Sequence, residues 1–344
     1  MKNKININDK TILVTGSSGF IGSFLCKRLL KETNSLIIGL DNMNNYYDVK
    51  LKEYRLNELN KYEKYRFIKG NLVNKELIIN IFNKYKPNIV VNLAAQAGVR
   101  YSIDHPDEYI ESNIIGFYNI LEACKDNPVE HLIFASSSSV YGSSTKAPFN
   151  ENNKIDKPVS LYAATKASNE LLAHAYSKLY NIPTTGLRFF TVYGPSGRPD
   201  MAYFNFTNKL VRGEKIKIYN YGNCKRDFTY IDDVIEGIIR VIKGSPVKTN
   251  IDAPYSIYNI GNSKPIDLLE FIRILEEKLV KEEVLHKDYD FKSLKELDKR
   301  QKGDVDLTYA DTSLLKKDYD YKPSTSLEEG LENFVKWYKT YYKK

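Results

Sequence analysis

The sequence is poor in the residues that build disulfide or cysteine–metal frameworks. Of its 344 residues only three are cysteines, Cys26, Cys124 and Cys224, and they are too few and too scattered for a disulfide scaffold or a cysteine-based metal site. No apolar run reaches the roughly 18 residues of a transmembrane helix, and the N-terminus lacks the apolar stretch of a signal peptide. We therefore expect a soluble, cytoplasmic protein with no bound metal and no membrane partner.

The charge balance is moderately basic. Lysine and arginine number 51 against 43 acidic residues, which leaves a formal net charge of +8. Such an excess suits nucleic acid, an anionic small substrate or simply a lysine-rich surface. A Walker-type GK[ST] sequence is absent, so nucleotide triphosphate hydrolysis is not supported. Nucleic acid is not our expected partner, and a non-catalytic NAD- or nucleic-acid-binding protein is a remote alternative.

The first 190 residues alternate apolar runs with helical patterns. Strands are predicted at 11–16, 36–41, 66–71, 88–95, 131–137 and 183–190, and helices at 20–32, 76–85, 114–125 and 160–180. Fully apolar strands that alternate with helices are typical of a parallel sheet covered on both faces. The fold class predicted is α/β, a Rossmann-type doubly wound parallel sheet.

The rhythm changes after Pro195, where Gly, Pro and Arg cluster and the later elements read as shorter and more polar. We predict a dinucleotide-binding domain over residues 1–190, with later contributions near 228–262. A smaller α/β substrate-binding domain is predicted over residues 191–344. The two domains are expected to be interleaved.

A glycine pattern follows the first predicted strand. Gly16, Gly19 and Gly22 form G-x-x-G-x-x-G between this strand and a helix, which permits a tight turn, close approach of a pyrophosphate and anion binding at the helix N-terminus. The second strand ends in Asp41, 19 residues after Gly22, where a carboxylate would bind ribose hydroxyls and repel a 2′-phosphate. The pattern favours NAD over NADP, and an ordinary glycine-rich turn is the alternative.

A tyrosine and a lysine share one face of the helix predicted at 160–180. Tyr162 and Lys166 are four residues apart. A tyrosine base near pH 7 must overcome about three pKa units, or about 4 kcal/mol, and a nearby ammonium and a nicotinamide cation act in that direction. Serines 136–139 lie at the end of the fifth strand, where open α/β sheets bind ligands. With 27 tyrosines in the chain, a chance pair is the alternative, and the serines could merely cap a turn.

Several longer motifs carry a family resemblance. They are TGSSGFIG (15–22), NLAAQAGVR (92–100), FASSSSVYG (134–142), YAATK (162–166), LRFFTVYGPSGRPDM (187–201) and KRDFTYIDDV (225–234). Together they resemble the extended short-chain dehydrogenase/reductase family, and within it the nucleotide-sugar 4-epimerases. The resemblance is strongest to UDP-glucuronate 4-epimerases of capsule polysaccharide synthesis and covers residues from about 10 to 340. It implies NAD as cofactor, a UDP-sugar substrate and a homodimer.

The resemblance assigns roles to individual residues. It implies that Tyr162 is the base, Lys166 its helper and Ser137 the partner of the sugar 4-hydroxyl, with Ser138 and Ser139 beside it. The implied NAD-binding residues are Gly16, Gly19, Phe20, Ile21, Gly22, Asp41, Asn42, Asn71, Leu72, Leu93, Ala95, Gln96, Asn113, Tyr162, Lys166 and Phe190.

The resemblance places the UDP end of the substrate on the later motifs. Arg226 is expected to meet a phosphate and Tyr219 to lie against uracil. Gln301 and Asp304 are expected to contact the ribose or the surroundings of the pyrophosphate.

The residues near Ser137 also bear on the reaction. Sugar dehydratases and decarboxylases of this family carry acidic residues after the active serine, whereas this chain has Ser138 and Ser139, so epimerisation fits best. The threonine at position 191 is similar to the one in the glucuronate enzymes. Arg198 is a candidate partner of a C5 carboxylate, because arginine suits bidentate recognition of that group. Arg100 is a weaker second cation. A loop salt bridge is the alternative for Arg198, and a neutral or N-acetylated UDP-hexose is the alternative substrate.

Overall fold

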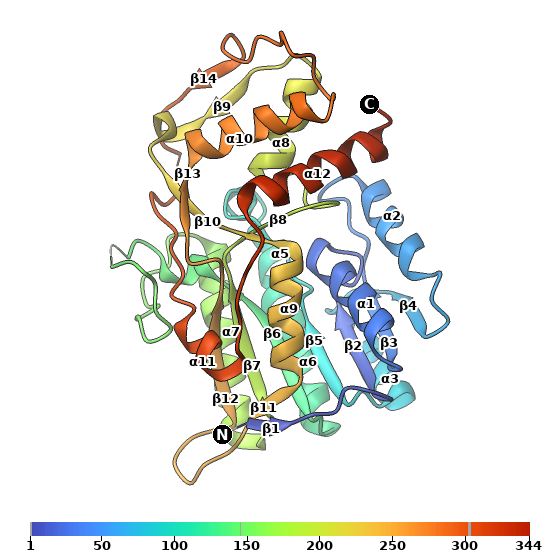
Figure 1. Ribbon diagram of the computed structural model, residues 1–344. Helices are drawn as coiled ribbons and strands as arrows, with labels where there is room; N and C mark the ends of the chain where they lie inside the picture. Colours follow the sequence, from blue (N-terminus) through green and yellow to red (C-terminus); the bar gives the residue numbers. More distant parts are fainter. Residues whose placement is uncertain (1, 145, 302–303) are drawn as a thin grey trace.

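A seven-stranded parallel sheet forms the centre of the molecule (Figure 1). The computed structural model describes residues 2–144, 146–301 and 304–344. The strand order is β12-β7-β6-β5-β2-β3-β4. The strands are β2 (Thr11–Thr15), β3 (Leu36–Asp41), β4 (Tyr65–Lys69), β5 (Ile89–Asn92), β6 (His131–Ser137), β7 (Thr184–Phe189) and β12 (Tyr255–Ile260). The predicted Rossmann-type fold is confirmed.

Helices cover both faces of this sheet, which explains why the central strands β2, β3, β5 and β6 are mostly apolar and buried. One face carries α1 (Phe20–Glu32), α2 (Val49–Leu59) and α9 (Ile231–Ile242). The other face carries α3 (Lys75–Tyr85), α6 (Gly116–Asp126) and α7 (Leu161–Tyr180). The carboxyl ends of the strands are left open between the helices, as in other doubly wound sheets.

The segment before α6 is more helical than predicted. Two short helices, α4 (Tyr101–Asp104) and α5 (Pro106–Tyr109), lead into a π-helical stretch, η1 (Ile110–Ile115). Strand β5 ends at Asn92, earlier than the predicted residue 95, and the chain then passes through residues 93–98 without regular structure. This loop crosses the carboxyl edge of the sheet.

A smaller part of the molecule follows β7. It contains a three-stranded sheet of β8 (Thr191–Tyr193), β10 (Lys225–Tyr230) and β13 (Pro265–Asp267), and the pair β9 (Ile216–Ile218) and β14 (Lys295–Leu297). Its helices are α8 (Ala202–Val211), α10 (Leu268–Lys281) and α12 (Leu327–Tyr342), which lie together beyond the open edge of the main sheet (Figure 1). The remaining elements are η2 (Ser138–Tyr141), η3 (Tyr219–Gly222), β1 (Lys2–Lys4), β11 (Gly244–Pro246) and α11 (Ser313–Tyr319).

The expectation that elements after Pro195 are shorter and more polar is wrong for three helices. Helix α9 is mostly buried and packs against α1, while α10 and α12 are 14 and 16 residues long. Helices α10 and α12 are amphipathic, with one apolar and one charged face. Their many charged residues made these segments read as polar, although their apolar residues recur with helical spacing. None of the helices in the described ranges is both long and apolar enough to cross a membrane.

A buried ion pair joins α7 to the two strands beneath it. Arg188 on β7 donates from Nε and Nη2 to the two carboxylate oxygens of Glu170 on α7, at 2.9 and 2.7 Å. Both side chains are 5% exposed. The Ser136 hydroxyl at the end of β6 donates to the same carboxylate at 2.5 Å. The pair therefore fixes how α7 lies on β6 and β7.

Removal of one partner of this pair is expected to be costly. Glu170→Gln leaves the Arg188 guanidinium buried without its counter-charge, and we expect the free energy of unfolding to fall by about 3–5 kcal/mol. Urea denaturation followed by circular dichroism measures it. The matched control is Glu270→Gln, which removes the exposed pair with Arg273 and is expected to change stability little. Equal effects of the two substitutions would contradict the prediction.

Candidate functional site

In the glycine loop between β2 and α1, the backbone at Gly16 lies close against the backbone of the loop that follows β5. Gly16 has a positive φ of 71°, and a Cβ there would lie 2.8 Å from the Ala94 amide nitrogen. A Cβ on Gly22 would collide with the Gly16 carbonyl oxygen. Helix α1 begins after Gly19, whose N-cap position makes no side-chain capping hydrogen bond. The first-turn N–H groups are thus available to an anion.

Asp41 lies at the carboxyl end of β3 beside this loop. Its carboxylate is 7% exposed and accepts hydrogen bonds from the backbone amides of Ser18 at 3.0 Å and Met43 at 2.8 Å. These amides orient a negative charge beside the glycine loop. A phosphate group at the same place would meet like charge, which favours a dinucleotide with a free ribose hydroxyl.

Tyr162, Lys166 and Ser137 lie at the carboxyl end of β6. Lys166 is 4% exposed, its Nζ donates to the Ala135 carbonyl at 3.0 Å, and this nitrogen lies 6.0 Å from the centre of the Tyr162 ring. The Ser137 hydroxyl accepts from the Ser139 amide and donates to the Ser139 hydroxyl at 3.1 Å. The predicted tyrosine, lysine and serine are therefore neighbours in space.

The protein groups alone do not lower the pKa of Tyr162. Burial raises the pKa of the Tyr162 phenol, and the Ser137 hydroxyl and the Arg198 charge oppose this effect. Burial also lowers the pKa of Lys166 to about 8. Further stabilisation of a phenolate must come from a cationic ligand beside the ring, and a nicotinamide cation has the required charge.

Arg198 is paired within its own loop. It donates from Nε and Nη2 to the Asp200 carboxylate at 3.1 and 2.6 Å, and the Tyr46 hydroxyl donates to the same carboxylate at 3.1 Å. Although burial opposes the charge, Asp200 raises the pKa of Arg198. The loop salt bridge left open in the sequence interpretation is thus present. Among the described residues, Arg198 Nη1 has no hydrogen-bond partner.

A second buried arginine holds the loop of Arg198 against the glycine loop. Arg55 on α2 is 3% exposed and donates to the carbonyl oxygens of Ser196 at 2.7 Å, Gly197 at 2.8 Å and Ser18 at 3.1 Å. Its position connects the two halves of the cleft.

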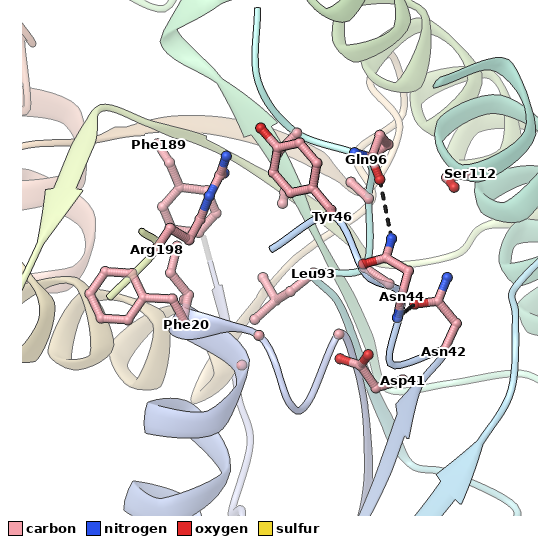
Figure 2. A pocket seen from close by; sticks show the side chains of 18 of the residues that line it. Phe20, Asp41, Asn42, Asn44, Tyr46, Leu93, Gln96, Ser112, Phe189 and Arg198 are labelled. Atoms are coloured by element: carbon pink, nitrogen blue, oxygen red, sulfur yellow. Dashed lines mark hydrogen bonds between the residues drawn. The ribbon is translucent and has the colours of Figure 1, made fainter. Parts of the chain in front are cut away.

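Most of the predicted residues line one cleft, shown in Figure 2. Those that line it are Gly16, Gly19, Phe20, Ile21, Gly22, Asp41, Asn42, Asn71, Leu72, Leu93, Ala95, Gln96, Ser137, Tyr162, Lys166, Phe190 and Arg198. The cleft runs from the glycine loop and Asp41 to the side chains of Arg198 and Tyr46 (Figure 2).

Four predicted residues lie outside the lining of this cleft. Asn113 is buried in η1, where its side chain accepts from the Gln96 amide at 2.8 Å and donates to the Gln96 carbonyl at 3.0 Å. Ser138 and Ser139 begin the short helix η2, and Thr191 begins β8. Asn113 therefore shapes the loop that carries Gln96.

Three residues predicted for the UDP end, Tyr219, Gln301 and Asp304, lie outside this cleft, and Arg100, predicted as a second cation for the sugar carboxylate, lies with them. Arg100 forms an ion pair with Asp304 at 2.9 Å and lies 4.7 Å from the centre of the Tyr219 ring. Gln301 and Asp304 line a second hollow, together with Phe149 and neighbouring loop residues. Lys302 and Gly303 of the same predicted segment lie outside the described residues.

Arg226 is the remaining residue predicted for the UDP end, and it contacts the segment that lines the second hollow through Asp306. Its Nη1 donates to the backbone carbonyls of Lys225 at 3.0 Å and Asp306 at 3.3 Å, and it lines neither hollow.

Several residues of the cleft were not predicted from the sequence. Asn44 and Tyr46 come from the segment between β3 and α2, and Lys52 comes from the first turn of α2. Their position in the chain could have indicated them, because this part of the chain follows the carboxyl end of β3, and doubly wound sheets bind ligands at the carboxyl ends of their strands.

The described residues fit a dinucleotide. The glycine loop has no room for a Cβ at Gly16 or Gly22, the first turn of α1 is uncapped, and Gln96 Nε2 is buried in the cleft without an acceptor. No cluster of three or more potential metal ligands occurs in the described part of the chain.

Comparison with protein families gives one match that covers most of the chain. Residues 12–261 match the NAD dependent epimerase/dehydratase family. Protein CapI of Staphylococcus aureus is 51% identical over 97% of this chain and 99% of its own length. UDP-glucuronate 4-epimerase 4 of Arabidopsis thaliana is 44% identical over 97% of this chain and 76% of its own length.

A solved structure is also closely similar. The UDP-glucuronic acid 4-epimerase from Bacillus cereus, in complex with UDP-glucuronic acid and NAD, superimposes with a TM-score of 0.85. It is 34% identical, and the match covers 96% of this chain and all of that chain.

The surroundings of Tyr162 predict a pH dependence. Because burial keeps the pKa of the Tyr162 phenol above its ordinary value in the protein without cofactor, only a small fraction is deprotonated near neutral pH, and we expect the rate of UDP-sugar turnover to be still rising with pH between 6 and 8. Lys166→Met removes an ammonium near the ring and is expected to move this rise upward by about one pH unit or more. Initial rates across the pH range measure it, with the exposed Lys178→Met on the same helix as control. A rise at the same pH in Lys166→Met would contradict the assignment.

Proposed function

The chain belongs to the NAD-dependent epimerase/dehydratase family, and from this membership we propose that it interconverts UDP-glucuronate and UDP-galacturonate through a 4-keto intermediate. One observation carries the proposal. Tyr162, Lys166, Ser137 and Arg198 line the same cleft as the glycine loop and Asp41. A base, its cationic partner and a cation for a carboxylate thus lie where a sugar beside a nicotinamide would be.

Each side chain has a defined task in this reaction. Tyr162 takes the proton of the 4-hydroxyl, and the Ser137 hydroxyl binds the same sugar oxygen. Lys166 stabilises the phenolate and is held by the Ala135 carbonyl. NAD⁺, held by the glycine loop and Asp41, would supply the acceptor for the C4 hydride and the donor that returns it to the opposite face of the ketone. Tyr162 then gives its proton back to the new hydroxyl.

The cleft offers little for elimination chemistry. Among its described lining residues the only carboxylate is Asp41, which is engaged by the amides of Ser18 and Met43 at the cofactor end. Loss of water from a sugar needs an acid and a base near C5 and C6. Their absence from the described lining favours epimerisation over dehydration.

The pairing of Arg198 gives a second candidate some support. Because Asp200 already neutralises this arginine, the cleft could also take a neutral or N-acetylated UDP-hexose. The acidic sugar remains our proposal because Arg198 Nη1 has no partner among the described residues and lies at the cleft. Thr191, the other residue predicted to distinguish the sugars, is the first residue of β8.

The domain assignment follows the same division of tasks. We propose that residues 1–190 with parts of 228–262 hold NAD, because β12 is an edge strand of the main sheet and α9 packs on α1. The rest of residues 191–344 would hold the UDP-sugar.

The UDP end of the substrate is assigned to the second group of residues. Tyr219 would lie against uracil, and Gln301 and Asp304 would contact the ribose or the surroundings of the pyrophosphate. The proximity of Arg100 to both Tyr219 and Asp304 supports placing these residues in one group. Arg226 would have to leave its carbonyl partners to reach a phosphate.

A homodimer is proposed on the exposed apolar side chains of the α6–α7 face. Leu171 on α7 is 69% exposed, and Ile110, Ile115 and Tyr118 of η1 and α6 are exposed as well. We further propose that the dimer acts in the cytoplasm and supplies capsule polysaccharide synthesis with an acidic sugar nucleotide.

The first test is product analysis by NMR. The purified protein, incubated with UDP-glucuronate without added NAD, is expected to form UDP-galacturonate with its own cofactor. Tyr162→Phe is expected to abolish turnover while NAD stays bound. Arg198→Ala is expected to lose UDP-glucuronate turnover selectively, by about tenfold or more, because a charge-assisted contact is removed. Turnover of UDP-glucose alone would favour the second candidate, and a UDP-pentose product would show that the intermediate loses CO₂.

The dimer is tested by light scattering coupled to size exclusion. The wild-type protein is expected to have twice the 39.7 kDa mass of the chain. Leu171→Glu places a charge on the proposed interface and is expected to shift the mass towards that of the monomer. Ile251→Glu, at an exposed loop position, is the control and is expected to stay dimeric. A monomeric wild-type protein would contradict the assignment.

A further inference from the structure

The cofactor cleft contains a buried lysine to which no role has been given. Lys52 on α2 is 5% exposed and lines the cleft. Its Nζ donates to the Asn44 carbonyl at 2.8 Å and to Asn44 Oδ1 at 2.5 Å, and it lies 4.9 Å from the centre of the Tyr47 ring. Both acceptors found for Lys52 Nζ among the described residues are thus neutral oxygens of Asn44, and no carboxylate there forms an ion pair with it. One of its three N–H donors is therefore without an acceptor.

A buried ammonium without a counter-charge is unfavourable. Asp41 is close enough to favour the charged form, but its two oxygens already accept the amides of Ser18 and Met43. Burial accordingly lowers the pKa of Lys52. The free-energy cost of burying this ammonium would be offset by an anion beside it, and the described residues do not supply one.

Asn44 connects the lysine to a second unsatisfied donor. Its Nδ2 donates to Gln96 Oε1 at 3.3 Å (Figure 2), which leaves Gln96 Nε2 as the free end of that amide. Gln96 Nε2 is buried without a partner, and the backbone of this residue is fixed by Asn113. Lys52, Asn44 and Gln96 form a connected polar chain, which we call the Lys52 arm, with unmet donors at both ends.

We propose that Lys52 binds the pyrophosphate of the dinucleotide, with Asn44 and Gln96 as the side chains that orient the contact. This rests on the proposed function only in taking NAD as the cofactor. The pyrophosphate is the anionic part of NAD, and the glycine loop and the uncapped α1 terminus line the same cleft. The Lys52 arm, which begins on α2, thus adds a positive charge that the backbone amides of the glycine loop do not have.

The arrangement has a consequence for the protein without cofactor. The ammonium of Lys52 then lacks an anion, so its replacement by an apolar side chain of similar length is expected to leave the cofactor-free protein at least as stable. The same replacement weakens the cofactor complex. If the lysine merely supported the fold, its replacement would destabilise the cofactor-free protein and would leave the affinity for the cofactor unchanged.

The experiment compares Lys52→Met with wild type, with Lys52→Arg as the conservative variant. Lys50→Met, an exposed lysine on the same helix, is the control. The NAD retained by each purified protein is measured by chromatography after acid release. Thermal shifts and calorimetry of the stripped proteins then use NAD⁺, ADP and adenosine as probes. We expect Lys52→Met to weaken binding of NAD⁺ and ADP by about 10- to 100-fold, with adenosine unaffected and Lys52→Arg close to wild type.

Three outcomes would overturn the proposal. Equal losses for adenosine and ADP would place Lys52 at the nucleoside. Unchanged NAD⁺ affinity with a less stable cofactor-free protein would make it a structural residue. A loss of UDP binding with NAD⁺ binding intact would place it at the substrate. If wild-type protein binds no NAD⁺ at all, the proposed function fails, which is distinct from each result on Lys52.

Discussion

The geometry of the cleft depends on one buried carboxylate. Glu170 receives Arg188 from β7 and Ser136 from β6, and all three groups are almost fully enclosed. Lys166 lies about one turn and Tyr162 about two turns before Glu170 on the same helix, so the Glu170–Arg188 pair sets where both side chains stand relative to β6. An apolar contact could hold α7 on the sheet, but it would tolerate sliding. Directional bonds to two strands fix both height and rotation.

Much of the fold could be predicted because its signals are local. Strands β3 and β6 and helix α1 have the predicted bounds, since each is an apolar or amphipathic run bounded by polar residues. Helix α2 could not be found this way. Its inward positions include Lys52 and Arg55 as well as leucines, and a charged side chain that points inward gives no apolar periodicity.

The same division holds for the site. The glycine loop and the Tyr162–Lys166 pair depend on spacings within one turn or helix, so the sequence indicates them directly. The pairing of Arg198 depends partly on Tyr46, which is more than 150 positions away in the chain and meets the Arg198–Asp200 pair only after folding. Contacts between segments that are distant in the chain are set by how the elements pack, so the spacing of residues in the sequence does not predict them.

The way Arg55 holds the two halves of the cleft has an evolutionary consequence. It bonds to the carbonyl oxygens of Ser18, Ser196 and Gly197, and every amino acid has a carbonyl. The attachment of the loop that ends at Arg198 therefore rests mainly on backbone atoms, although Gly197 itself must stay small, because a Cβ there would collide with the Tyr203 hydroxyl. Selection for a new sugar can act on Arg198 without first rebuilding the anchor of its loop.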